Sequence, residues 1–407
     1  MLVICFLLIS VLIGLSSAIF LRSLTESRIA QHFSQSSSAF WIAEAGIQRT
    51  IWELNSNSCT GFTSSTGTAC TSCSNCGTGN KTLAASLTSY GDYDLTLNSG
   101  NTLVTATGSY PDRSSVKKST RALQATLSSG SLFTSAVYAQ GNISFGKNLL
   151  VDSYNSASGA YGGSNINTNG DVGSNGTASG TITIDKDSTI KGDVSTGVSG
   201  TVTSGSNVTI TGSTTHTNNV SLPSVTVPSS LTGLSSSGSY SVADNSTGLI
   251  SSGSYKYSDI SLGKNAILTI TGNVTMYLTS AAALSAQKDV QISVASGGSL
   301  TIYTDGVIDL SKDATINNTT QDPSKFIIYS SYSSASGTGV DFSKSGDFFG
   351  VIYCPDSNVN FKKSGNIYGS IVGKTVSMDK DQNIHYDETL NNISGGSGYS
   401  TSAWQET

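Results

Sequence analysis

Tyrosine residues recur at nearly equal intervals in the second half of this 407-residue chain. Their spacings are 26, 26 and 24 residues, and lysines next to Asn or Asp repeat at 24 and 24 residues. Each period holds about three short β runs separated by Gly, Asn, Asp or Ser, a pattern typical of a parallel β-helix. The two series are Tyr277, Tyr303, Tyr329 and Tyr353, and Lys264, Lys288 and Lys312. We therefore predict a right-handed parallel β-helix over residues 131–390.

A β-sandwich is the alternative for this region, although it does not explain the near-equal tyrosine intervals. The composition favours a mainly β chain, because only 12% of residues are charged and 43 are Gly. Apolar residues thin out over 155–180 and 229–254, where we expect insertions or loose loops. The recurring Lys-Asn and Lys-Asp pairs are interpreted as a ladder of solvated turns. A net charge of −5 argues against a nucleic-acid partner.

The first 21 residues are uncharged, and Arg22 is the first charged residue. At ~1.5 Å per residue such a helix reaches ~30 Å, the thickness of a hydrocarbon core. No Pro occurs before Pro111, so one helix can run over residues 1–54. A cleaved signal peptide, with Ser16-Ser17-Ala18 as its cleavage site, and a plain single-pass anchor with a stalk are the alternatives.

The second half of this helix has an apolar stripe. Its large side chains fall at strict seven-residue spacing, which predicts packing among copies of the helix. The expected filament-packing residues are Phe33, Phe40, Ile47 and Leu54.

Residues 39–47, Ala-Phe-Trp-Ile-Ala-Glu-Ala-Gly-Ile, and the polar stretch 22–30 resemble the N-terminal segment of PilX-like type IV pilins. The resemblance implies a subunit that is processed by a prepilin peptidase, held in the inner membrane and then extracted into a helical filament of pilins. Major pilins usually carry a Glu at mature position five, which pairs with a neighbour's amine. If Met1 is at or beside the mature terminus, this chain has Cys5 instead. Register would then depend on other charges, namely Arg22, Glu26, Arg28 and Glu44.

The other end of the repeat region carries a second resemblance. Segments 349–356, 369–373 and 385–388 resemble a C-terminal domain of many PilX-like proteins, with the pattern GxIYxP, GxIVxK and HYDE. This resemblance implies the same pilus setting and no known catalysis. Residues 391–407, rich in Gly and Ser, are expected to form a flexible tail.

Residues 55–130 are expected to form a small pilin-like head. Three β runs predict a short antiparallel meander against the upper helix. Four clustered cysteines outside the cytoplasm predict two disulfides of open pairing, with a metal site or free thiols as alternatives. These are Cys59, Cys70, Cys73 and Cys76, while Cys354 is expected to be a buried thiol.

Catalytic chemistry has weak support. Polysaccharide enzymes on β-helices use clustered carboxylates, and Asp305 lies near Asp309, but Arg is scarce in this region. His385, Asp387 and Glu388 could hold a metal, although caps on the last coil are the favoured interpretation. We expect no enzyme activity, no metal and no cofactor.

The predicted function is a structural pilin-like subunit of an extracellular, type IV pilus-like surface filament, with the β-helix displayed outside. The inner membrane is its expected location before assembly. One alternative is a minor or tip pilin acting as an adhesin, with surface glycans as candidate partners. The other is a membrane-anchored, β-helical, polysaccharide-active enzyme.

Overall fold

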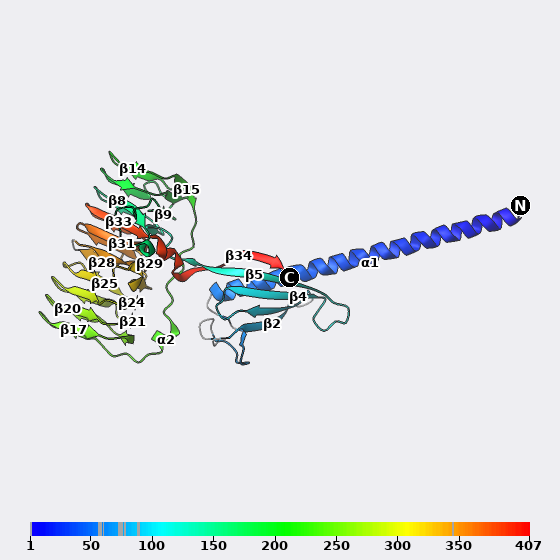
Figure 1. The fold of residues 1–407 in the computed structure, drawn as a ribbon, viewed down its shortest axis with the longest axis horizontal. Coiled ribbons are helices and arrows are strands. Elements are labelled where there is room, and N and C mark those ends of the chain that lie inside the picture. The colour runs from blue at the N-terminus through cyan, green and yellow to red at the C-terminus, as the bar shows by residue number, and fades with distance from the viewer. Residues whose placement is uncertain are drawn as a thin grey trace. The chain divides into compact units, whose positions relative to one another are not determined.

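The computed structural model describes residues 2–55, 59, 61–71, 76, 79–87, 90–343 and 346–407. Two compact units make up the chain: a head unit, Met1–Gly130 with Gly398–Thr407, and a β-helix unit, Ser131–Ser397. The fold class is the predicted one: mainly β, with a long N-terminal helix, a small antiparallel sheet and long parallel sheets that form a β-helix (Figure 1). The right-handedness of the β-helix stays a prediction.

Helix α1 spans Leu2–Asn55, which corresponds to ~80 Å at ~1.5 Å per residue. From Ser36 onward one face is buried against the sheet of the head unit, and small residues such as Ala39 and Gly46 line that face. A Cβ on Gly46 would lie 2.7 Å from the Leu95 side chain, and one on Gly108 would lie 2.1 Å from the Ala39 carbonyl oxygen. Small side chains therefore let the helix and the sheet approach each other closely.

The sheet of the head unit has six strands, and its described neighbours from β1 to β5 pair antiparallel. Its core contains Leu95, Leu97, Val104 and Leu123 together with Ile47 of α1. In spatial order the strands are β1 (Thr63–Ser64), β2 (Lys81–Leu87), β3 (Gly91–Leu97), β4 (Leu103–Tyr110), β5 (Ser119–Ser131) and β34 (Ser394–Glu406).

The prediction of a flexible tail over residues 391–407 is wrong, because β34 joins this sheet beside β5. The Trp404 ring lies 5.9 Å from the Phe40 ring, and Arg121 pairs with Glu406 at 2.6 Å. An uncovered β5 would expose a long edge of unpaired backbone groups. Pairing with β34 satisfies that edge, which Gly and Ser content alone does not reveal.

The β-helix unit contains two series of coils joined by a connector, residues 219–239. The first series comprises β6 (Val137–Ala139), β7 (Ile143–Phe145), β8 (Leu150–Tyr154), η1 (Ser156–Ser158), β9 (Val172–Ser174), β10 (Ile182–Ile184), β11 (Thr189–Ile190), β12 (Val194–Gly197), β13 (Val202–Ser204), β14 (Thr209–Ile210) and β15 (Thr214–Asn218). The connector contains α2 (Ser229–Thr232).

The second series of coils begins after the connector. Its elements are β16 (Tyr240–Val242), β17 (Thr247–Ile250), β18 (Gly253–Tyr257), β19 (Ile260–Leu262), β20 (Ile267–Ile270), β21 (Asn273–Leu278), β22 (Ala282–Ala286), β23 (Gln291–Val294), β24 (Ser299–Thr304), β25 (Val307–Leu310), β26 (Thr315–Asn318), η2 (Pro323–Lys325), β27 (Phe326–Ser330), β28 (Thr338–Ser343), β29 (Phe348–Cys354), β30 (Asn358–Lys362), β31 (Gly365–Gly373), β32 (Val376–Met378), β33 (Gln382–Asp387) and η3 (Glu388–Asn392).

The second series of coils precedes the first series in the stack, although it follows the first series in the sequence. Strand β7 pairs with β10 on one side and with β32 on the other, and β8 lies likewise between β11 and β33 (Figure 1). The last coil of the chain therefore packs against the first. The connector returns from the β15 end to the β16 end, and Tyr353 donates a hydrogen bond to its Pro223 carbonyl at 2.6 Å.

The tyrosine ladder is confirmed. Tyr277, Tyr303, Tyr329 and Tyr353 are successive partners in register on β21, β24, β27 and β29. The rings of Tyr303 and Tyr329 stack at 5.1 Å. Parallel coils of similar length place equivalent residues above one another, so the sequence period equals the length of a coil.

The two segments expected to be loose behave differently. Residues 155–171 form an insertion that carries η1, and β9 follows directly after it. The expectation is wrong for residues 229–254, because this stretch contains α2, β16 and β17, and Leu231 and Ile250 are buried. Pairing with the next coil organises a strand even where its own apolar residues are few.

Candidate functional site

Helix α1 presents a long apolar surface. Residues 8–34 are exposed on every face of the helix, and Leu12, Ile19 and Phe20 are each at least 60% exposed. By length and composition α1 could cross a membrane. The side chain of Cys5 lies outside the described part of the chain.

The four residues expected to pack in a filament do not share one environment. Phe33 is 76% exposed and Phe40 is half-buried, whereas Ile47 and Leu54 lie in the core of the head unit. A seven-residue repeat drifts by ~20° per heptad on a straight helix, or ~60° over three heptads. The stripe therefore rotates from the solvent into the sheet, and the expectation is corrected for Ile47 and Leu54.

Three of the four predicted register charges lie on the exposed part of α1, and Glu44 lies in the part that packs on the head unit. Arg22 pairs with Glu26 across one helical turn at 3.0 Å, and both side chains are exposed. Arg28 is exposed, and half-buried Glu44 accepts a hydrogen bond from Gln48 at 3.3 Å. Exposed pairs of this kind contribute less than about 1 kcal/mol to the stability of the folded chain.

Two exposed tryptophans are not among the site residues predicted from the sequence. Trp41 is 64% exposed and Trp52 is 56% exposed, and the Arg49 guanidinium lies 5.0 Å from the Trp52 ring centre. Eleven residues make about three helical turns, so the two rings project from one face. That spacing is the signal in the sequence that identifies this face.

The cysteine cluster contains a disulfide between Cys70 and Cys76. Cys59 is also disulfide-bonded, and Cys73 lies outside the described residues. Cys354 is a buried free thiol, as expected, and its sulfur lies 2.8 Å from the Ser357 hydroxyl oxygen.

A buried polar network lies beneath the 155–171 insertion. His385 Nδ1 is 2.6 Å from Asp152 Oδ1, and both residues are buried. Lys191 lies 3.5 Å from Asp152 Oδ2, which also accepts a hydrogen bond from the Tyr161 hydroxyl at 2.9 Å. The Tyr161 ring lies 3.8 Å from the His385 ring and covers it. Burial and the hydrogen bond to Asp152 both raise the pKa of Tyr161, so its hydroxyl remains a donor.

His385, Asp387 and Glu388, the candidate metal ligands that the sequence offers, do not converge on one point. Asp387 caps η3 by accepting a hydrogen bond from Thr389 N, while Glu388 accepts hydrogen bonds from Ser153 and Asn169. Within the described residues, no group of three or more His, Cys, Asp or Glu could hold a metal ion. The interpretation of these residues as caps on a terminal coil is wrong, because β33 is covered by β8.

The candidate catalytic carboxylates also have structural partners. Asp305 accepts hydrogen bonds from Tyr277 and Ser331, and Asp309 accepts one from Ser311 N at 3.0 Å. These contacts join neighbouring coils or shape turns, which gives each carboxylate a structural role.

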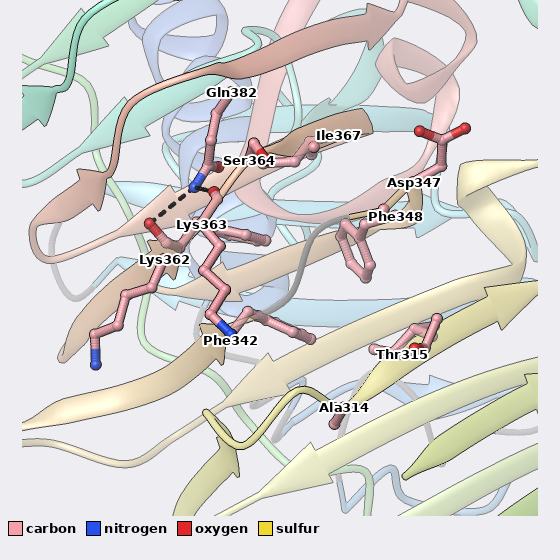
Figure 2. A pocket seen from close by; sticks show the side chains of 14 residues that line it. Ala314, Thr315, Phe342, Asp347, Phe348, Lys362, Lys363, Ser364, Ile367 and Gln382 are labelled. Carbon is pink, nitrogen blue, oxygen red and sulfur yellow. Dashed lines mark hydrogen bonds between the residues drawn. The ribbon is translucent and has the colours of Figure 1, made fainter. Parts of the chain in front are cut away.

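An open cleft of about 490 Å³ lies beside the insertion. Its aromatic residues come from three strands and the insertion: Tyr154 from β8, Tyr161 from the insertion, Phe349 from β29 and Tyr368 from β31. A second, smaller pocket of about 40 Å³ has Phe342, Phe348 and Phe361 among its lining residues (Figure 2). It is a gap between core aromatic side chains of the β-helix.

The comparisons with known proteins cover these regions unequally. A family model described as a domain of unknown function (DUF7305) matches residues 217–393, less than half of the chain. This match corresponds to the connector and the second series of coils. No curated protein sequence matches. The chain is similar to the competence-associated pilin ComZ from Thermus thermophilus, at 10% identity, over 92% of this chain and 97% of that chain. The TM-score is 0.22, which is too low to indicate a shared fold.

Proposed function

We propose that the chain is a pilin-like structural subunit that assembles into an extracellular filament through α1. The single observation that carries this proposal is the exposure of α1 over residues 8–34. Burying one large apolar side chain is worth roughly 1.5–3 kcal/mol, so a surface of this kind needs a covering partner.

A bilayer can cover only part of that surface. The hydrocarbon core is ~30 Å thick, whereas α1 is ~80 Å long. Residues 8–21 fit the bilayer, but the segment beyond Arg22 combines charges with exposed Ile29 and Phe33. Helices from neighbouring subunits can cover both parts, because apolar groups can pack together and charges can find partners in a bundle.

The head unit fits this arrangement. It buries one face of α1 only from Ser36 onward, and it leaves Trp41 and Trp52 exposed on the opposite side of that helix. In this proposal the inner membrane holds α1 before assembly, and other pilin-like helices replace the lipid afterwards. In this proposal the β-helix unit is displayed on the outside of the filament and has no catalytic function.

A charge on the exposed stripe tests the proposal. Phe33→Asp should reduce the filament content of sheared surface fractions at least tenfold, because an unpaired charge inside a helix bundle costs several kcal/mol. The protein should remain at normal abundance in the membrane fraction, since Phe33 is 76% exposed in the subunit.

The matched control is Val116→Asp, which also replaces an apolar side chain with a carboxylate, at a fully exposed residue of the head unit. It should leave filament content unchanged. Normal filaments containing the Phe33→Asp chain would contradict the proposal. Phe40→Asp is a less clean variant, because Phe40 also contacts Trp404 within the head unit.

A further inference from the structure

We propose that the cleft beside the 155–171 insertion binds a neutral or amino sugar unit of a glycan. The inference deepens the proposed function, since a β-helix displayed outside the cell would meet surface glycans. It rests on four features of the cleft: a fixed wall, clustered aromatic rings, an acidic rim and an unsatisfied buried hydroxyl.

The insertion forms a fixed wall. The Asn165 side chain donates to the carbonyls of Asn155 and Gly159 at 3.0 Å each, and it accepts from Asn155 N at 3.1 Å. Glu388 accepts from Asn167 and Asn169 at the other end of the insertion. The cleft is therefore preformed, which reduces the entropy lost on binding.

Aromatic rings cluster in the cleft. Phe349 and Tyr368 stack at 4.2 Å with an interplanar angle of 6°, and Tyr161 lies 5.7 Å from both Tyr368 and Tyr154. The negative face of an aromatic ring attracts the positively polarised C–H groups on one side of a pyranose. Rings of this kind recognise the apolar face of a sugar.

The charged residues that line the rim of the cleft are acidic. Asp322 and Asp347 line the cleft beside Gln321 and Ser156, and no Lys or Arg is among the described lining residues, although the Lys325 ammonium lies 4.0 Å from the Asp322 carboxylate. Carboxylates and amides can accept hydrogen bonds from sugar hydroxyls, and they attract an amino group. An acidic sugar would be repelled, which defines the class of ligand.

The Tyr154 hydroxyl is the independent sign of a missing partner. Tyr154 lines the cleft and is 2% exposed, yet its hydroxyl has no hydrogen-bond partner. A buried unpaired hydroxyl is unfavourable. A hydroxyl of a bound sugar could satisfy it.

The test is saturation-transfer difference NMR on the full chain in micelles of a detergent without a sugar head group. Methyl β-glucoside, glucosamine, glucuronate and propylammonium serve as probes. We expect saturation transfer to at least one of the two sugars that carry no negative charge, and none to glucuronate. Phe349→Ala should weaken that binding at least tenfold, and Asp347→Asn should weaken it several-fold.

The control is Asp289→Asn, which removes the same charge at an exposed turn of the second coil series. It should leave binding unchanged. If Phe349→Ala fails to fold, exposed Asp347 still provides the decisive comparison with Asp289. No transfer to either sugar, transfer to propylammonium alone, or equal loss in the control would overturn the proposal. The assay uses unassembled chains, so its failure leaves filament assembly to its own test.

Discussion

Single residues at the turns set the coil geometry of the β-helix unit. Asn265, Asp289 and Asp313 have φ values of 55°, 60° and 62°, and each follows one of the repeating lysines. Among residues other than Gly, Asn and Asp adopt this left-handed conformation most easily. The Lys-Asn and Lys-Asp pattern is thus explained by the backbone conformation of the second residue.

A substitution at one such turn should be costly. Asn265→Val should destabilise the unit by about 1–2 kcal/mol, because a β-branched residue is strained at positive φ. Asn265→Gly should cost less, since it keeps the conformation and loses only the side-chain bond to Asn245. Thermal unfolding followed by near-UV circular dichroism of the tyrosine ladder measures both variants. Equal melting temperatures for the two variants would contradict this account.

At the scale of elements, the sequence predicts the existence of α1 and of the β coils well. The uncharged run before Arg22 predicts a long helix, and the tyrosine period predicts register partners such as Tyr303 and Tyr329. Local patterns suffice here, because a helix and a repeated coil depend mainly on near neighbours.

Other elements depend on distant partners and escape such patterns. Strand β34 forms only because β5 presents an edge to it, and the heptad residues Ile47 and Leu54 are buried because the sheet of the head unit covers them. The aromatic cleft likewise brings Tyr154 and Tyr161 of the first coil series together with Tyr368 of the distant strand β31. No spacing within a short window predicts these encounters.

At the scale of the whole molecule, the order of the coils is the least expected feature of the β-helix unit. The first coil of the chain lies between a coil that follows it and the last coil. Residues 219–239 can reach ~70 Å when extended. The path from β13 to β16 crosses nine strand steps of ~4.8 Å, or ~43 Å. The connector is therefore long enough for this arrangement.

A double-cysteine variant tests the coil order. Ser144 and Ser377 are exposed register partners on β7 and β32, so Ser144→Cys with Ser377→Cys should form a disulfide under mild oxidation. Adjacent strands are ~4.8 Å apart, within the usual Cα range for a disulfide. Peptide mapping by mass spectrometry identifies the link. The control pairs Ser144→Cys with Ser241→Cys, an exposed position on β16 at the far end. A link in the control and none in the test pair would refute the coil order.

Site-specific photo-crosslinking from position 33 in cells tests the filament account most directly. A photoreactive amino acid replaces Phe33, which is 76% exposed on α1, and mass spectrometry identifies the crosslinked peptide in sheared surface filaments. The account predicts a crosslink to the N-terminal helix of a second copy of this chain or of another pilin-like subunit. Crosslinks confined to lipid or to the same chain, with this protein lacking from the filament fraction, would contradict it.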